Sequence, residues 1–343
     1  MKELYMRRAL QLAELAMGQT APNPMVGCVL VKDDKIIGEG YHKAFGGPHA
    51  EVHAIESIQE GQSAEGCSAY VTLEPCAHFG KTAPCAELLI RNKIKEVFIA
   101  TKDSNPLVSG KGIERLKRAG IVVHLGLLEA ESRKLNKRFF TFYEKNRPYV
   151  MLKWAQTKDG FLDRQRESKE VGINWITAPE TKALVHKWRS EEQAILVGRN
   201  TIINDNPTLT VRQYYGKNPL RVVIDSQLQI TENSKQVFSE DAPTLIFNRI
   251  KNHQEKNVTW VKIPETSTKC VLEHLYKRGI QSLMVEGGSR TLQYFIVDNV
   301  WDEANVLVGD VKFDSGVKAP ILNKIPSNTY TFGPDRIYHF ERL

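Results

Sequence analysis

Three residues suited to binding zinc, with a carboxylate beside one of them, constrain this chain most. His49-Ala50-Glu51 comes first, Pro75-Cys76 follows, and Cys85 comes after eight intervening residues. One imidazole and two thiolates make three ligands, whereas a structural zinc site is usually closed by four protein ligands. The fourth position is then open to water, whose pKa falls to about 7 on the metal. The pattern predicts a catalytic metal site with His49, Cys76 and Cys85 as its ligands.

Glu51 lies two residues after His49, which makes it a poor second ligand to the same ion but places it beside the bound water. Zinc deaminases divide the work in this way, because water attacks an amino-bearing ring carbon while a Glu that is not a ligand moves protons. We therefore predict a hydrolytic deaminase with Glu51 as the proton shuttle. The alternative is a structural Cys/His cluster with a fourth ligand, for which His53 and His78 are the obvious residues.

The local sequence suits this geometry. Residues 49–58 after Gly46-Gly47-Pro48 are typical of a helix, residues 69–73 of a strand, and the run from Cys85 of a second helix. A helix N-terminus favours the thiolate form of a cysteine. We expect the ligands to converge through the fold and not through proximity in the chain.

The length of 343 residues predicts two hydrophobic cores. We place the boundary near residue 146, after a charged stretch, which gives domains 1–145 and 146–343. Strands expected at 97–100 and 122–125 flank a helix at 112–119, so the first domain is predicted to be α/β. The second is also predicted to be α/β, with strands at 149–153, 194–197, 221–225, 244–247, 283–286 and 305–308.

The net charge and the cysteine content indicate which kinds of partner and which cellular compartment to expect. The net charge of +7 favours anionic partners, which phosphorylated metabolites satisfy as well as nucleic acid does. Because no basic tract is interleaved with aromatic residues, we expect no nucleic-acid partner. The five cysteines are odd in number and two belong to the metal pattern, which favours a reducing compartment. No apolar run is long enough for a membrane span or a signal peptide, so a cytoplasmic location is expected, and small α/β domains often form homo-oligomers.

The motifs of the first half resemble a known family. The runs 22–29, 46–54 and 72–85 resemble the bifunctional riboflavin-biosynthesis deaminase/reductase, whereas other cytidine deaminases typically space their cysteines by two residues. The resemblance implies a cytidine-deaminase-like mixed sheet flanked by helices. It also implies a phosphorylated pyrimidine substrate, which would be contacted by Asn23, His42, Lys81, Asp103 and Asn105. Ordinary turn chemistry is the alternative for these residues, and Ser104 stands where the family has Pro.

The second half carries a weaker local signal. Val285-Glu286-Gly287-Gly288-Ser289 reads as a strand that ends in Glu-Gly-Gly before a helix, where backbone N–H groups could approach a phosphate. A plain strand-to-helix turn is the alternative. The G-x-G-x-x-G fingerprint of a Rossmann dinucleotide site is absent where that fold would need it.

The runs 153–160, 175–177, 197–198, 201–212 and 285–288 are similar to the reductase half of the same family. The resemblance implies a dihydrofolate-reductase-like fold that binds NADPH through Ala155, Trp175, Thr201, Ser226, Gly287 and Gly288. It implies that Arg189 and Arg212 hold the substrate phosphate, and that Lys153, Asp205 and Glu286 surround the sugar, with Lys153 and Asp205 as catalytic residues. Three features depart from the family: Ile173 replaces a Ser, Asn206 replaces an Asp, and residues 161–172 form a longer and more charged segment.

The function predicted from the sequence is bifunctional. The zinc-dependent half would deaminate 2,5-diamino-6-(5-phosphoribosylamino)pyrimidin-4(3H)-one, and the NADPH-dependent half would reduce the ribosyl group of the resulting uracil to ribityl. Two alternatives remain open. One is a nucleic-acid base deaminase with a C-terminal binding domain, and the other is a zinc-stabilised binding protein without turnover.

Overall fold

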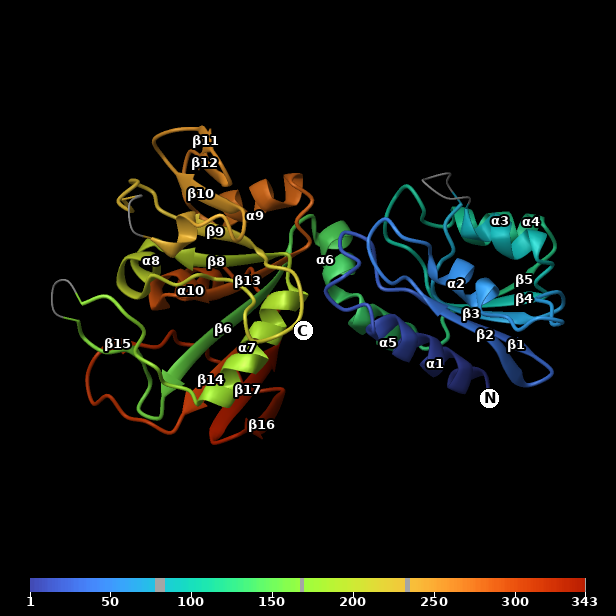
Figure 1. Cartoon of the computed structure of the whole chain (residues 1–343), viewed down its shortest axis with the longest axis horizontal. Coiled ribbons are helices and arrows are strands. Elements are labelled where there is room, and N and C mark those ends of the chain that lie inside the picture. The colour runs from blue at the N-terminus through green and yellow to red at the C-terminus, as the bar shows by residue number, and fades with distance from the viewer. Residues whose placement is uncertain (78–83, 167–169, 232–234, 343) are drawn as a thin grey trace. The chain divides into compact units, whose positions relative to one another are not determined.

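The computed structural model describes residues 1–77, 84–166, 170–231 and 235–342. The chain forms two compact units, Met1–Asn146 and Arg147–Leu343 (Figure 1). Each has its own sheet and its own hydrophobic core.

Unit 1 is a three-layer α/β/α structure. Its five-stranded sheet has the order β2-β1-β3-β4-β5, in which β3, β4 and β5 run parallel and β1 and β2 are antiparallel neighbours. The strands are β1 (Gly27–Lys32), β2 (Lys35–Tyr41), β3 (Ser68–Leu73), β4 (Glu96–Thr101) and β5 (Val122–Leu125). The helices are α1 (Lys2–Glu14), α2 (Ala50–Glu56), α3 (Cys85–Arg91), α4 (Lys111–Arg118), α5 (Glu129–Leu135) and α6 (Lys137–Lys145).

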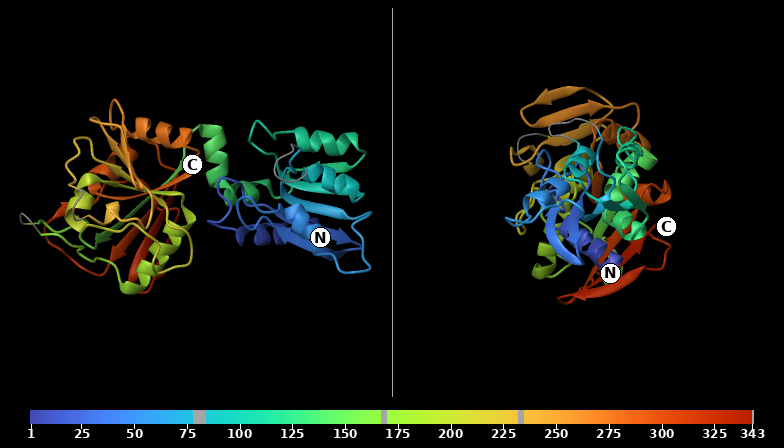
Figure 2. Two further views of the ribbon diagram at one scale, coloured as in Figure 1. Left: turned by 45° about the horizontal axis from the view of Figure 1, so that its top comes forward. Right: turned by 90° about the vertical axis from the view of Figure 1, so that its right-hand side faces the viewer.

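Both faces of this sheet are covered, because alternate residues of each central strand point to opposite sides. On one face, Val71 and Ile99 pack with residues of α2, α3 and α4 in a single apolar cluster. On the other face, Tyr70 and Phe98 pack with residues of α1. Helices α3 and α4 lie side by side over the first face (Figure 2). This arrangement brings the start of α2, the end of β3 and the start of α3 to one edge of unit 1.

Unit 2 is built on a ten-stranded sheet of order β11-β12-β10-β9-β8-β13-β6-β14-β17-β16. The central strands from β12 to β14 are parallel, and both ends of the sheet add antiparallel strands. Its strands are β6 (Tyr149–Thr157), β8 (Ala194–Gly198), β9 (Leu220–Ile224), β10 (Thr244–Asn248), β11 (His253–Glu255), β12 (Val258–Lys262), β13 (Ser282–Gly287), β14 (Glu303–Gly309), β16 (Asn328–Phe332) and β17 (Asp335–Glu341). A separate two-stranded sheet pairs β7 (Phe161–Asp163) with β15 (Val317–Lys318).

Helices cover both faces of the large sheet. Helices α9 (Thr268–Lys277) and α10 (Ser289–Val297) pack on the face that includes Leu152 and Phe247. Helices α7 (Pro179–Glu191) and α8 (Arg199–Asp205) pack on the other, and a short 3₁₀ helix, η2, spans Gln236–Phe238. In open parallel sheets, ligands bind beyond the carboxyl ends of the strands. In unit 2 those ends lead into α8 after β8 and into α10 after β13.

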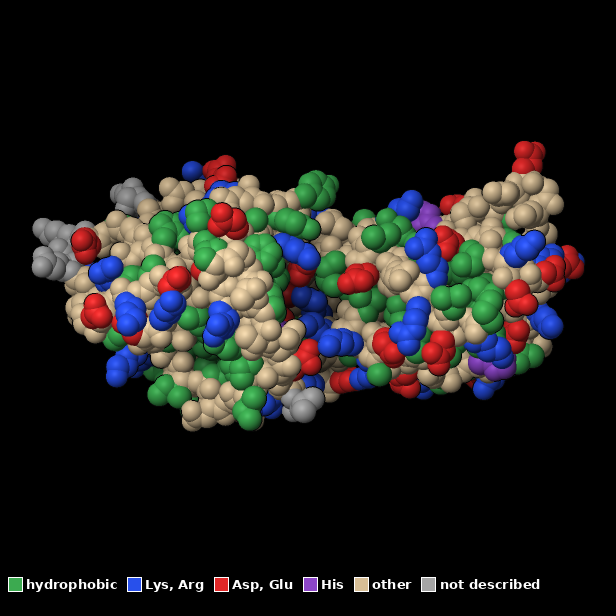
Figure 3. All heavy atoms as spheres, turned by 90° about the horizontal axis from the view of Figure 1, so that it is seen from below, with side chains coloured by type: hydrophobic (Ala, Val, Ile, Leu, Met, Phe, Trp, Pro, Cys, Tyr) green, Lys and Arg blue, Asp and Glu red, His purple; other side chains and the backbone are tan. Residues whose placement is uncertain are grey.

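The predicted α/β class is confirmed, and the predicted element boundaries differ from the observed ones by up to four residues. The helix predicted at 49–58 is α2 (Ala50–Glu56), with His49 as its N-cap residue. Helices α5, α6, α7, α8 and α9 were not among the predicted elements. Of the helices in the described part of the chain, none combines the length and apolar character needed to span a bilayer. The face drawn in Figure 3 carries Lys and Arg side chains interspersed with Asp and Glu side chains.

Candidate functional site

The structure brings the three predicted zinc ligands together in unit 1. His49 comes from the N-cap of α2, Cys76 follows β3, and Cys85 is the first residue of α3. Their ligand atoms all lie within 4.8 Å of one another. The Nδ1 atom of His49 is 3.3 Å from Cys85 Sγ and 3.6 Å from Cys76 Sγ. A tetrahedral zinc ion, with bonds of about 2.1 Å to N and about 2.3 Å to S, sets such atoms about 3.6 Å apart. The residues therefore fit zinc.

The protein environment favours the thiolate form of Cys76. The hydrogen bond from the Cys85 thiol, together with His49, lowers the pKa of Cys76 to about 4, and the same contact raises the pKa of Cys85. The Cys85 backbone N–H, at the start of α3, also points at Cys76 Sγ at 3.4 Å. A divalent cation binds thiolates and displaces the remaining proton. The hydrogen bond to Cys76 raises the pKa of His49.

Glu51 lies in the first turn of α2 and is buried, with 3% of its surface exposed. Burial is the main cause that raises the pKa of its carboxyl group, followed by the negative charge of Cys76. A raised pKa makes the carboxylate a stronger base, so it takes up a proton more readily. Glu51 also lines the cavity beside the ligand cluster, which suits the predicted role of proton shuttle.

A cavity of about 320 Å³ opens beside the ligand cluster. The described residues that the sequence predicted for the deaminase pocket line it: Asn23, His42, His49, Glu51, Cys76, Asp103 and Asn105. Cys85 is buried behind them, and Lys81 lies outside the described residues. Cavities of this size suit small molecules.

His42 and Asn23 form a fixed polar pair in this cavity. His42 Nδ1 lies 2.9 Å from the Pro48 carbonyl, and His42 Nε2 lies 3.1 Å from Asn23 Nδ2. A proton on Nδ1 satisfies both contacts, since the carbonyl then accepts and the Asn23 amide donates to Nε2. Burial lowers the pKa of His42, which favours the same neutral form. The pair therefore keeps one orientation.

The loop after β4 carries Asp103 and Asn105, which the sequence offered either as substrate contacts or as ordinary turn residues. They make ordinary turns, because Asp103 Oδ1 accepts from the Asn105 N–H at 2.6 Å and Asn105 Oδ1 accepts from the Leu107 N–H at 3.1 Å. They also line the cavity. Burial raises the pKa of Asp103 to about 6. Ser104, which replaces the family's Pro, donates to Glu144 at 2.7 Å.

Glu74 was not predicted as a site residue, yet it organises this loop. Its buried carboxylate accepts hydrogen bonds from the backbone N–H groups of Asp103, Gly110, Gly112 and Ile113, at 2.9 to 3.3 Å. Gly112 packs so closely that a Cβ atom there would meet the Pro75 carbonyl oxygen at 1.8 Å. Glu74 thus joins the end of β3, next to Cys76, to the loop of Asp103 and to the start of α4. The Thr72-Leu73-Glu74-Pro75-Cys76 motif was the only local signal for it.

Other residues missed by the sequence come from α6 and its N-cap. Phe139 and Tyr143 line the cavity, with ring centroids 4.8 Å apart. Buried Asn136 exchanges hydrogen bonds of 2.8 and 2.9 Å with the backbone of Met25, which steadies the loop that carries Asn23. Nothing in the local pattern marks these residues, because α6 lies more than 100 residues from that loop.

In unit 2, Lys153, Arg189 and Glu286 form a buried charge cluster. Arg189 donates from Nε and Nη2 to the two Glu286 oxygens, at 2.6 and 2.7 Å, and Lys153 Nζ lies 3.9 Å from Glu286. The positive charges of Arg189 and Lys153 outweigh burial and hold the pKa of Glu286 at about 2, whereas burial lowers the pKa of Lys153. Arg189 is therefore oriented by Glu286. Arg212 is more exposed and donates to Thr210 Oγ1 at 3.0 Å.

Two cavities lie beyond the carboxyl ends of β8 and β13. The Ser226 cavity, of about 320 Å³, is lined by Ser226, Thr266 and Thr268 among others. The Asp205 cavity, of about 560 Å³, is lined by Asp163, Asp205 and Lys318 among others. Both share the lining residues Asn200, Thr201, Gly288, Arg290 and Tyr294. Thr201 Oγ1 accepts a hydrogen bond from the Gly288 N–H at 3.0 Å, which ties the turn after β13 to α8.

The remaining predicted cofactor residues are not among those that line these two cavities. Ala155 of β6 packs against the cluster around Met151, and Gly287 ends β13 beside Gly288. Trp175 is 55% exposed, with Lys182 Nζ 3.4 Å from its ring centroid.

Two of the three departures from the family pattern are single substitutions, and the structure places them differently. Asn206 follows α8 with φ of 44°, a left-handed conformation that Asn tolerates better than most residues. Ile173 is 45% exposed, and no described cavity includes it.

Comparison with known proteins identifies the family. The cytidine and deoxycytidylate deaminase zinc-binding region matches residues 1–101, and the RibD C-terminal domain matches residues 148–311. The chain is 45% identical over 310 residues to the riboflavin biosynthesis protein RibD of Aquifex aeolicus, which covers 89% of this chain and 85% of that protein. The chain belongs to the RibD family. The Escherichia coli relative is 37% identical over 330 residues, covering 92% of this chain and 84% of its own.

Solved structures agree with the family. A Thermotoga maritima diaminohydroxyphosphoribosylaminopyrimidine deaminase/5-amino-6-(5-phosphoribosylamino)uracil reductase superposes with a TM-score of 0.89 and 37% identity, covering 100% of this chain and 99% of that one. Acinetobacter baumannii RibD gives a TM-score of 0.88 with 32% identity, covering 99% and 98%. The predicted family and fold class, including the deaminase-like and reductase-like folds, are confirmed.

Loss of the Glu74 carboxylate should loosen the loop around Asp103. Glu74→Ala removes the acceptor of several buried N–H groups, each costing about 1–3 kcal/mol when unpaired. We expect faster hydrogen–deuterium exchange across residues 103–113, a lower free energy of unfolding of unit 1, and weaker zinc retention.

Glu87→Ala is the matched control, because it also removes a glutamate of unit 1 but breaks a surface ion pair with Arg115, typically worth about 0–1 kcal/mol. Exchange in residues 103–113 that is equal in both variants would contradict the role assigned to Glu74.

Proposed function

We propose that this chain carries out two consecutive steps of riboflavin biosynthesis, with the deaminase in residues 1–145 and the reductase in residues 146–343. The observation that carries the proposal is a three-ligand zinc site beside a cavity in unit 1, in a chain whose second unit matches the RibD C-terminal domain. The substrates are those named for the Thermotoga relative: the diamino-pyrimidinone ribosyl phosphate, and then the corresponding aminouracil.

The residues of unit 1 suit hydrolytic deamination. A zinc ion held by His49, Cys76 and Cys85 supplies Lewis acidity that makes water acidic near neutral pH. Glu51 removes a proton from the attacking water, passes it to the pyrimidine ring and returns a proton to the departing ammonia. The neutral His42–Asn23 pair presents a fixed polar edge, and Asp103 and Asn105 complete the wall that orients the pyrimidine.

The residues of unit 2 suit reduction of an opened ribose. NADPH supplies the hydride. Lys153 donates a proton to the sugar oxygen, since burial has already lowered its pKa. Glu286 fixes Lys153 and Arg189 in place, and Arg212 adds a positive charge for the phosphate. Thr201, Ser226, Gly287 and Gly288 hold the cofactor around the two cavities, with Ala155 and Trp175 at its edge.

We also propose a cytoplasmic, self-associating protein that acts on small molecules and binds neither nucleic acid nor membrane. The alternative of a nucleic-acid base deaminase predicts RNA or DNA binding that weakens steeply with salt. The proposed function predicts no such binding.

One reaction tests both activities. Zinc-loaded protein, NADPH and the diamino-pyrimidinone ribosyl phosphate are mixed, and ammonia release and NADPH absorbance are recorded together. We expect both signals to change, with ammonia leading, because only the deaminated product is reduced. Glu51→Gln should abolish both signals while zinc stays bound, and added aminouracil ribosyl phosphate should restore NADPH loss alone. Ammonia release by this variant would contradict the shuttle role.

Lys153 is tested by its own substitution. Lys153→Met should slow NADPH consumption at least about 100-fold, the lower range for loss of a general acid, and leave ammonia release unchanged. Lys158→Met is the matched control, because Lys158 lies just beyond β6 and pairs with Asp310 at the surface. NADPH consumption by Lys153→Met at the rate of that control would refute the assignment.

A further inference from the structure

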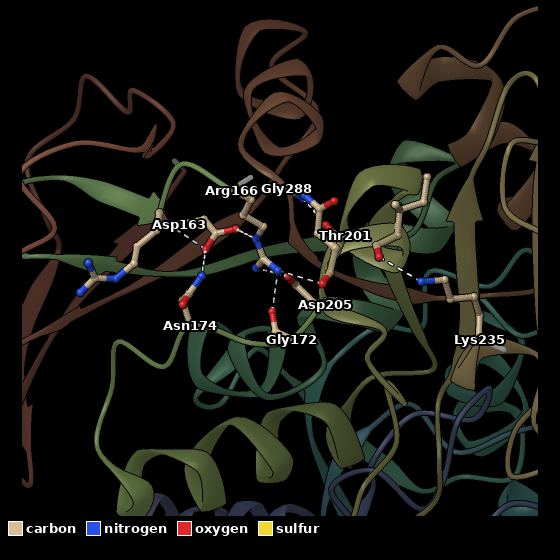
Figure 4. Close-up of polar contacts among 11 residues, drawn as sticks. Asp163, Arg166, Gly172, Asn174, Thr201, Asp205, Lys235 and Gly288 are labelled. Carbon is tan, nitrogen blue, oxygen red and sulfur yellow. Dashed lines mark hydrogen bonds and ion pairs between the residues drawn. The ribbon is translucent and has the colours of Figure 1, made fainter. Parts of the chain in front are cut away.

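The charged segment after β7, which departs from the family pattern, places one arginine against Asp163 and Asp205, two carboxylates that line the Asp205 cavity. Arg166 has only 11% of its side chain exposed. Figure 4 shows its guanidinium between Asp163 and Asp205, with Gly172 beside it. Neither the sequence motifs nor the proposed mechanism gives this residue a role.

Arg166 makes four hydrogen bonds to three separate elements. It donates from Nε to Asp163 Oδ2 at 2.8 Å, and from Nη2 to Asp205 Oδ1 at 2.6 Å. Its Nη1 donates to the carbonyls of Gly172 and Asn204, at 2.7 and 2.8 Å. One side chain thereby joins β7, the segment before α7 and the last turn of α8.

The neighbours of Arg166 reinforce this junction. Asp163 Oδ1 accepts from Asn174 Nδ2 at 2.7 Å, two residues after Gly172 (Figure 4). The Gly172 N–H donates to the Asn204 carbonyl at 2.8 Å. The segment that leads to Trp175 is thus tied to the same helix end as Asp205.

Asp205 needs a cation at this position. It is the last residue of α8, where the helix dipole disfavours a carboxylate, and it is 29% exposed in a cavity wall. Burial raises its pKa to about 6 and the Asp163 carboxylate adds to the rise, while Arg166 opposes both. Arg290 and Lys318 are the other charged groups that line this cavity. Without Arg166, two carboxylates would face each other in a partly buried site.

We propose that Arg166 is a positioning residue that holds Asp205 as a fixed, ionised acceptor for hydroxyl groups of NADPH in the Asp205 cavity, in place of the catalytic role at the substrate sugar that the family resemblance implies. This inference rests on the proposed reductase function. Arg166 acts through Asp205, because its donors are directed to protein oxygens. A lysine could supply the charge but not the planar fork that reaches both carboxylates and both carbonyls.

The test is NADPH binding by the full chain, followed by cofactor fluorescence from pH 5.5 to 9. In the wild type, binding should weaken as the pH falls through about 6, where Asp205 gains a proton. Arg166→Met should move this midpoint upward by about two pH units, within the range known for a carboxylate that loses an arginine. At pH 7 the ionised fraction of Asp205, and with it the NADPH affinity, should fall about tenfold. Arg166→Lys should restore the midpoint toward that of the wild type.

Two controls separate this role from a general effect on folding. Arg164→Met removes a neighbouring arginine that stacks on the Phe313 ring outside the cavity, and it should bind NADPH like the wild type. In Asp205→Asn, NADPH affinity should no longer fall at low pH. Adding Arg166→Met to this variant should cause no further change in NADPH affinity. Thermal unfolding of each variant reports whether unit 2 is intact.

The outcomes are distinct. Wild-type protein that binds no NADPH would refute the proposed reductase. Two results would overturn the role of Arg166 while leaving the reductase proposal intact, provided that the wild type binds NADPH. One is a pH midpoint of NADPH binding that Arg166→Met leaves unchanged. The other is a loss of NADPH affinity on adding Arg166→Met to Asp205→Asn that equals its loss in the wild type.

Discussion

The convergence of one imidazole and two thiolates is the constraint on which unit 1 depends. These ligands come from the starts of two helices and the end of a strand, and the sheet must bring those ends to one edge. Close packing follows from this requirement. Pro75 lies against Gly112, and the Glu74 carboxylate binds the N–H groups that start α4, so the residues next to Cys76 cannot move independently of the cavity wall.

Unit 2 uses charge in a different way. It holds two separate groups of paired charges, one around Glu286 and one around Arg166. In the first, two cations keep a buried carboxylate ionised, and in the second, one cation is shared by two carboxylates. Both follow the rule that a buried charge persists only when it is paired and hydrogen-bonded. Such pairs also hold side chains in single positions, as hydride transfer to a sugar requires.

The sequence was most informative where chemistry depends on residue type. His49, Cys76, Cys85 and Glu51 were predicted because few other residues bind zinc or shuttle protons, and the Pro and Gly that flank them mark the turns. The sequence was least informative where backbone groups or distant elements contribute. Glu74 acts through N–H groups 29 to 39 residues away, and Phe139 and Tyr143 reach the cavity only because α6 folds back on it. The same reason explains Arg166, whose partner Asp205 is 39 residues distant. Asn206 departs from the family pattern, and its left-handed conformation supplies a physical reason for an Asn at this position.

The metal centre is tested most directly by X-ray absorption at the zinc edge of the purified chain. The account predicts one zinc ion with two sulfur ligands at about 2.3 Å and two nitrogen or oxygen ligands at about 2.0–2.1 Å. One of the latter should be exchangeable with small anions, and His49→Ala should remove the other together with most of the bound zinc. A closed site of four protein ligands that excludes exchangeable ligands would contradict the catalytic assignment and favour a structural zinc.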